Sequence, residues 1–114
     1  MNINPEEIYN RLESVGIEWS GANAKAELLH ECQKSELSEI SLEYLDSGCK
    51  SMAEAEARAR ATERYKVYIG EMVEAKRQAN DAKVRYAAAQ AWFEGMRTQA
   101  ATLRQEMKSL PHTT

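Results

Sequence analysis

The side chains that could form an active site are few in this chain of 114 residues, and they lie in one short stretch. His30 stands between Glu27 and Glu31, and a carboxylate beside a histidine can poise a general acid or base. Cys32 lies two positions after His30, which on a helix points it elsewhere, so we expect no Cys–His nucleophile pair. The same pattern is typical of a solvated helix face, and we interpret it so. We therefore expect a protein that is not an enzyme.

The sequence also lacks a recognised motif for binding a metal ion or a phosphate group. Cys32 and Cys49 lack a Cys-x-x-Cys spacing, and the two histidines, His30 and His112, are far apart, whereas structural zinc needs four close ligands. The five glycines are scattered and form no phosphate-binding loop. We expect neither a metal ion nor another cofactor, and we expect reduced thiols in a cytoplasmic protein.

Basic residues of the C-terminal half form the clearest binding pattern. Several of them are separated from one another by seven residues or a multiple of seven, so they lie along one edge of a helix. Such a row can follow a nucleic-acid backbone, with Trp92 and tyrosines available for base stacking. The candidate nucleic-acid-binding residues are Lys76, Arg77, Lys83, Arg85, Arg97, Arg104 and Lys108.

A structural interpretation of the same row stays open. Lysines and arginines beside a coiled-coil seam usually pair with carboxylates of a neighbouring helix and cover the core with their stems. The net charge of −3 argues against a protein that coats nucleic acid by bulk charge, but not against a local basic strip. The acidic residues that could pair with the row are Glu27, Glu31, Glu36, Glu39, Glu43 and Asp46.

A long helix is expected to position these basic side chains. Residues 65–110 keep one heptad register in which every a and d position is apolar or aromatic, and no proline occurs before Pro111. This pattern predicts a left-handed coiled coil. The seam residues are Tyr65, Tyr68, Met72, Ala75, Ala79, Ala82, Tyr86, Ala89, Phe93, Met96, Ala100, Leu103, Met107 and Leu110.

Two shorter helices are predicted before it. Asn4 and Pro5 suit a helix start, and Gly16 suits a stop, so residues 5–15 should form a short N-terminal helix. A joint at residues 19–21 should precede a second helix over residues 22–46.

The long helix is predicted to span residues 51–109. Ser51 and Glu54 form a capping box at its start, and Glu54–Arg58 and Glu56–Arg60 are pairs at i, i+4. Any bend or break is expected near Gly70, because glycine costs about 1 kcal/mol in a helix interior. The fold class is thus all-α, an elongated helical hairpin or coiled coil in a single domain, residues 1–114.

The length of the seam argues for more than one chain. Residues 65–110 would form a helix of roughly 70 Å, whereas a second helix of about 25 residues reaches roughly 37 Å. We therefore expect a homo-oligomeric helical bundle. The candidate oligomerisation residues are Tyr65, Tyr68, Met72, Ala79, Ala82, Tyr86, Ala89, Phe93, Met96, Leu103 and Met107.

Location follows from what the sequence lacks. No apolar run is long enough to span a membrane, and the first residues have neither a basic start nor an apolar stretch of the signal-peptide kind. We expect a cytoplasmic protein without a membrane partner.

Residues 78–107 combine an alanine-rich helix, the pair Trp92–Phe93, then Arg97, and an ending from Thr102 to Met107. In these features the chain resembles small phage coiled-coil proteins of recombination and replication modules. Over residues 25–108 the plan is similar to the recombination mediators of T-even phages, the UvsY type. The resemblance implies an oligomer that binds single-stranded DNA, a recombinase or a single-strand-binding protein as further partners, and the host cytoplasm as its location if a phage encodes it.

Three functional hypotheses follow. The first is a non-enzymatic recombination mediator or accessory protein. The second is a phage anti-defence inhibitor that blocks a host nuclease or surveillance complex by protein contact. The third is a structural coiled-coil adaptor. Binding of single-stranded DNA separates the first from the others.

Overall fold

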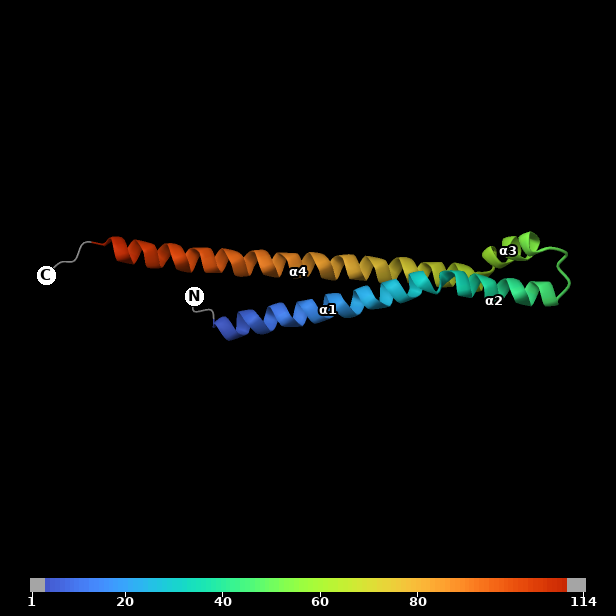
Figure 1. Ribbon diagram of the computed structural model, residues 1–114, viewed down its shortest axis with the longest axis horizontal. Coiled ribbons are helices and arrows are strands. Elements are labelled where there is room, and N and C mark those ends of the chain that lie inside the picture. Colours follow the sequence, from blue (N-terminus) through green and yellow to red (C-terminus); the bar gives the residue numbers. More distant parts are fainter. Residues whose placement is uncertain (1–3, 111–114) are drawn as a thin grey trace. The chain divides into compact units, whose positions relative to one another are not determined.

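The computed structural model describes residues 4–110, and in this range it consists of helices without a strand (Figure 1). The predicted all-α class is therefore confirmed. The helices are α1 (Pro5–Glu31), α2 (Gln33–Asp46), α3 (Met52–Arg60) and α4 (Glu63–Ser109).

Contacts group the chain into two units, which are described separately here. Unit 1 combines residues Met1–Trp19 with Ala82–Thr114, and unit 2 comprises Ser20–Asp81. Each unit thus pairs an early stretch of the chain with a part of α4. The expectation of a single domain stays a prediction.

In unit 1 the start of α1 packs antiparallel on α4. The guanidinium carbon of Arg11 lies 5.9 Å from the ring centroid of Trp92, and Glu18, seven residues later, forms an ion pair with Arg85, seven residues earlier. Asn4 caps α1, because its side-chain oxygen accepts a hydrogen bond from the N–H of Glu6 at 2.9 Å. The predicted hairpin pairing and the predicted cap at Asn4 are both present.

The prediction of a short helix over residues 5–15 is wrong. Helix α1 continues through Gly16 and the expected joint at residues 19–21 and ends at Glu31. Apart from Gly16, its protected residues recur at heptad spacing through this stretch: Ile8, Leu12, Val15, Trp19, Ala22, Ala26 and Leu29. Packing of this continuous face outweighs the cost of about 1 kcal/mol for each glycine in a helix interior.

In unit 2 the chain changes direction at Cys32, between α1 and α2. The hydroxyl of Tyr68 donates a hydrogen bond to the carbonyl of Leu29, which in a regular helix would accept the N–H of Gln33. Gln33 instead donates from its side chain to the hydroxyl of Tyr65 at 3.1 Å. A side chain inserted into the helical hydrogen-bond ladder is a recognised cause of a kink, so the predicted helix over residues 22–46 is divided here.

The turn between α2 and α3 follows its sequence signals. Gly48 has φ of 107°, and the N–H of Cys49 donates to the carbonyl of Tyr44, as in a Schellman motif. Ser51 caps α3 by accepting the N–H of Glu54 at 3.2 Å, as predicted. Helices α2 and α3 pack against each other in unit 2, where Ile40 is buried together with the small residues Ser41, Ala55 and Ala59.

The predicted helix over residues 51–109 is also divided, but not near Gly70. Helix α3 ends at Arg60, and α4 begins at Glu63. The hydroxyl of Thr62 accepts the N–H of Tyr65 at 3.1 Å and donates to the carbonyl of Ala59, so Thr62 caps the new helix. Gly70 lies inside α4.

Candidate interaction surface

The predicted seam of α4 is the protected face of that helix as far as Met96. Between residues 65 and 96 every a and d residue is buried or half-buried, and of the other residues only Ile69 is protected. Ala75, Ala79 and Ala82 are at most 5% exposed. Nine of the proposed oligomerisation residues therefore pack within the chain: Tyr65, Tyr68, Met72, Ala79, Ala82, Tyr86, Ala89, Phe93 and Met96.

This finding corrects the length estimate from the sequence. The predicted helix over residues 22–46 was expected to cover about half of the seam, and the predicted helix over residues 5–15 a little more. Helix α1 instead continues through residues 16–21, so α1 and α2, of 27 and 14 residues, form a partner that is interrupted only at Cys32. A second chain is therefore not needed to cover residues 65–96.

Residues 97–110, which we call the overhang, are different. The antiparallel register of unit 1 places Ile8 level with Met96, and α1 begins only one turn earlier. Every residue of the overhang is exposed, including the seam residue Ala100. The exposed fractions are 55% for Leu103, 70% for Met107 and 64% for Leu110.

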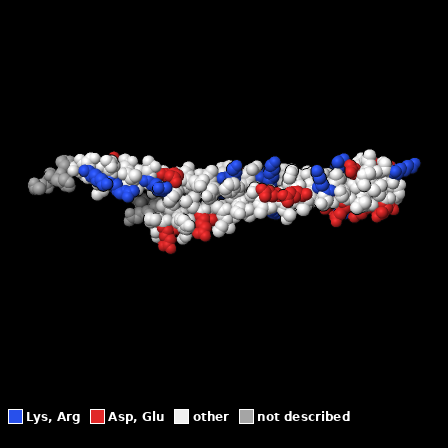
Figure 2. All heavy atoms as spheres, in the orientation of Figure 1, with Lys and Arg blue, Asp and Glu red and all other residues white. Residues whose placement is uncertain are grey.

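Basic side chains gather along the C-terminal part of α4 (Figure 2). Arg97, Arg104 and Lys108 lie in the overhang, whereas Lys83 and Arg85 precede it. Arg97 contacts Glu94 at 3.5 Å, with both side chains 66% exposed, an arrangement that contributes little stability. Arg85 lies on the opposite edge of the seam and pairs with Glu18. Among the predicted nucleic-acid-binding residues of unit 1, Lys83, Arg104 and Lys108 make no ion pair with any residue in the range 4–110.

The remaining two candidates for nucleic-acid binding lie in unit 2. Arg77 donates to Glu74 at 2.6 Å and to Asp81 at 2.9 Å on the same helix. The hydrogen bond and charge of Arg77 lower the pKa of Glu74, and Glu74 in turn raises the pKa of Arg77. Lys76 is exposed beside α1. Of the seven candidates, Arg77, Arg85 and, at the longer distance of 3.5 Å, Arg97 are thus paired with carboxylates.

The acidic residues of α2 bind a basic residue outside the predicted row. Arg64, at the start of α4, contacts Glu36 at 3.0 Å and both Glu39 and Glu43 at 3.1 Å. The hydrogen bonds that Arg64 donates to Glu36 and Glu43 raise the pKa of Arg64. The predicted pairing of these carboxylates with a basic side chain of the neighbouring helix therefore occurs at Arg64. Within residues 4–110 none of Glu36, Glu39 and Glu43 forms an ion pair with Lys76 of the predicted row.

Both tryptophans contact residues of unit 1. Trp19 and Tyr86 place their ring centroids 5.3 Å apart with an interplanar angle of 32°. Trp92 carries the Arg11 guanidinium over its ring and is still 38% exposed. A cation over an aromatic face is attracted by the ring quadrupole, so Trp92 serves the pairing of α1 with α4.

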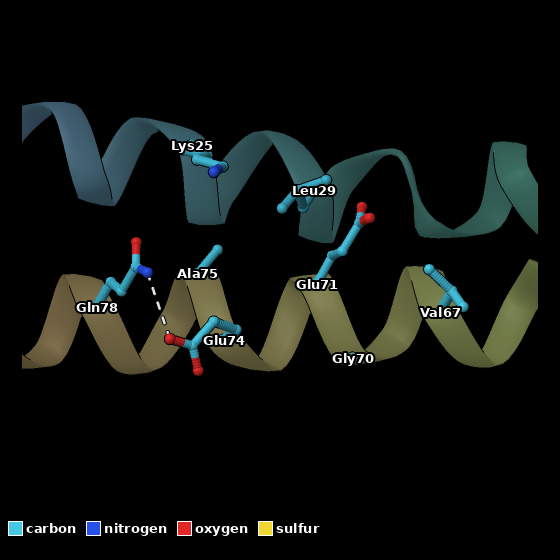
Figure 3. Close-up of a pocket in the computed structure, with 8 residues that line it drawn as sticks. All are labelled: Lys25, Leu29, Val67, Gly70, Glu71, Glu74, Ala75 and Gln78. Carbon is cyan, nitrogen blue, oxygen red and sulfur yellow. Dashed lines mark hydrogen bonds between the residues drawn. The ribbon is translucent and has the colours of Figure 1, made fainter.

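Unit 2 has an open depression on each side of its α1–α4 pair. The first has a volume of about 420 Å³, and Glu71 reaches across it from α4 toward the turn of α1 that carries Leu29 (Figure 3). Its other polar residues include Lys25 and Gln78, whose side-chain amide donates to Glu74 at 3.3 Å. Carboxylates therefore dominate this side.

The second depression, which we call the groove, has a volume of about 670 Å³. Glu27, His30 and Glu31 of α1 form one rim, and Lys76 of α4 stands on the other. The groove is lined between them by the apolar residues Ala26, Met72, Val73 and Ala79. His30 and its two carboxylates thus belong to an open surface beside apolar side chains.

Other chemistry has little support in the described part of the chain. Residues 4–110 contain no group of three or more His, Cys, Asp or Glu side chains placed to hold a metal ion. Cys32 is exposed and Cys49 half-buried, and both are free thiols. None of the described helices is long and apolar enough to cross a membrane.

Sequence reasoning missed two features of this surface. One is the heptad in α1, which was detectable from Ile8 to Leu29 if Gly16 and Gly21 were read as interior positions. The other is the contact of Tyr68 with Leu29, which has no local signal because 39 positions separate the two residues.

Comparisons with known proteins add no relative: no protein-family model, curated protein or solved structure matches this chain. The resemblance to phage recombination mediators therefore stays a prediction, as do the DNA-binding and oligomerisation roles assigned from the sequence. The functional proposals rest on the geometry of the two units alone.

Proposed function

We propose that this is a non-enzymatic binding protein that assembles with itself through the overhang of α4. The observation that carries the proposal is the continuation of the heptad seam into exposed positions, at Ala100, Leu103, Met107 and Leu110. A regular apolar stripe on an exposed helix is the surface that a coiled-coil partner covers. The overhang thus supports a homo-oligomer, although most of the seam is already occupied within the chain.

The mass of the protein in solution tests this proposal. Light scattering across micromolar concentrations should give more than one chain for the wild type. The double variant Leu103→Lys with Met107→Lys should shift the mass to a single chain, because two charges would enter the apolar interface. The matched control is Val67→Lys with Val84→Lys, which changes two exposed apolar residues outside the seam and should keep the wild-type mass. A single-chain mass for the wild type throughout would contradict the proposal.

Binding of single-stranded DNA, in the role of a recombination mediator or accessory protein, is a second candidate function. It is supported by the absence of ion pairs at Lys83, Arg104 and Lys108 within residues 4–110 and by the loose pairing of Arg97. Unit 1 offers this row on one helix, so a phosphate backbone could meet several cations in succession. A recombinase or a single-strand-binding protein would be a further partner in that role.

A salt titration of DNA binding tests the second candidate. The logarithm of the binding constant should fall with the logarithm of salt concentration with a slope of several units. Lys83→Glu or Arg97→Glu should weaken binding and reduce the slope, whereas Lys34→Glu, which alters an exposed lysine of α2, should change neither. Absence of binding at low salt would reject it and favour the protein-contact hypotheses, an anti-defence inhibitor of a host nuclease or surveillance complex, or a structural adaptor.

A further inference from the structure

We propose that the overhang of one molecule docks into the groove of unit 2 of a second copy. This inference rests on the proposed self-assembly and names the surface that receives the overhang. The two surfaces complement each other in polarity. The overhang presents Leu103 and Met107, exposed and apolar, and the groove is lined by Ala26, Met72, Val73 and Ala79.

The charges of the two surfaces match in sign and in spacing. Glu27 and Glu31 on the α1 rim are one helical turn apart, and so are Arg104 and Lys108 of the overhang. Arg104 occupies an e position and Lys108 a b position, which lie on the same side of the apolar seam. The two cations can therefore meet the two carboxylates while the seam residues face the groove.

The opposite rim is complementary as well. Lys76 stands across the groove from Glu27 and Glu31. In the overhang Glu106 occupies a g position, on the other side of the seam from Arg104. A helix with a basic edge and an acidic edge thus fits between an acidic rim and a basic rim, and a helix with its charges exchanged would be repelled at both.

Pairing of two overhangs with each other is less favourable. In an antiparallel pair the e positions face each other, which brings Arg97 and Arg104 of the two molecules together. In a parallel pair g faces e, which offers Arg104 only Gln99. Like charges beside a seam disfavour association, whereas the groove supplies opposite ones.

Docking of an overhang in a groove is a head-to-tail contact. Each molecule gives one surface and receives with another, so the assembly closes into a ring, of which a reciprocal dimer is the smallest, or grows into an open chain. The measured mass should accordingly rise above one chain with concentration. The association should weaken as salt is added, because charge pairs at the rims are exposed and screened.

Charge reversal on each surface tests the inference with the full-length chain. Glu27→Lys with Glu31→Lys, in the groove, and Arg104→Glu with Lys108→Glu, in the overhang, should each raise the concentration needed for association by about tenfold or more. Glu13→Lys with Asp46→Lys is the control for the groove variant, since it makes the same change in net charge as that variant at exposed positions outside the groove and should leave association unchanged. Circular dichroism verifies that each variant is helical.

Mixing the two variants gives the decisive result. An equimolar mixture should associate again, because the basic overhang of the groove variant meets the acidic groove of the overhang variant, and the reversed pair also matches in sign. If the groove variant associates as the wild type does while the overhang variant does not, the groove is not the receiver, and self-assembly through the overhang still stands. If the wild type itself is a single chain, both proposals are wrong.

Discussion

Tyr68 of α4 donates its hydroxyl proton to the main-chain carbonyl of Leu29, at the last turn of α1. The bond occupies the carbonyl oxygen of Leu29, which would accept the main-chain N–H of Gln33 if α1 continued. Helix α2 begins at Gln33. Tyr65, one turn before Tyr68, accepts a hydrogen bond from the Gln33 side chain. Two tyrosines of one helix therefore define where the opposite helix is interrupted.

Removal of the Tyr68 hydroxyl should destabilise the protein without leaving a cavity in the packed seam, because the ring is kept. We expect Tyr68→Phe to lower the free energy of unfolding by about 1–2 kcal/mol, because the half-buried Leu29 carbonyl loses its partner. The melting temperature followed by circular dichroism should fall by roughly 3–8 °C. Tyr9→Phe, at a side chain that is 66% exposed, is the control and should change it little. Equal effects of the two variants would contradict the role of the Tyr68 bond.

The same hydroxyl makes stability depend on alkaline pH. Desolvation raises the pKa of Tyr68 above its ordinary value of 10.0, and the electrostatic influence of Cys32, Glu36 and Glu71 adds to the shift. A raised pKa means that the folded state holds the proton more tightly than the unfolded state. The stabilisation is therefore complete below the ordinary pKa and is lost as pH rises through the folded-state value.

Urea unfolding at a series of pH values measures this loss. The midpoint of the wild type should decline at pH values above about 10, the ordinary tyrosine pKa. The decline should be smaller in Tyr68→Phe, and the phenolate absorbance of the wild type should show one tyrosine that titrates late. Parallel pH profiles of the two proteins would show that Tyr68 does not carry the dependence.

Arg64 is expected to stabilise unit 2 by holding three carboxylates of α2 together. Arg64→Gln leaves Glu36, Glu39 and Glu43 without their shared cation on one face of a helix, where they repel each other. We expect a lower urea midpoint, with a difference from wild type that shrinks as salt is added. Arg77→Gln, which breaks only contacts within α4, should have the smaller effect. A larger effect of Arg77→Gln would reject this ranking.

Three glycine-to-alanine substitutions separate packing from helix propensity. Gly21→Ala and Gly70→Ala meet no atom within 4 Å, so each should raise the free energy of unfolding by about 0.5–1 kcal/mol. At Gly16 a new Cβ would lie 3.3 Å from the Tyr86 ring, which is stacked on Trp19, so Gly16→Ala should gain less or destabilise. Thermal unfolding measures all three. An equal gain in unfolding free energy for Gly16→Ala would mean that the Tyr86 ring moves aside without an energetic cost.

Local patterns in the sequence predicted much of this protein. The heptad from Tyr65 to Met96 is the protected face of α4, and the caps at Asn4 and Ser51 are where their side chains indicated. The pairs Glu54–Arg58 and Glu56–Arg60 are also present, at 3.2 and 3.9 Å. These features depend on residues within one or two helical turns, or on a periodicity that repeats over many residues, so the sequence alone determines them.

Tertiary packing decided where the helices are interrupted and which surfaces are left exposed. Gly16 and Gly70 carry local stop signals, yet both lie inside helices, because continuous packed faces outweigh a cost of about 1 kcal/mol per glycine. The interruption at Cys32 depends on the hydroxyl of Tyr68, which is far away in the sequence. The overhang exists only because the antiparallel register ends at Ile8, and no local pattern specifies how two distant stretches align.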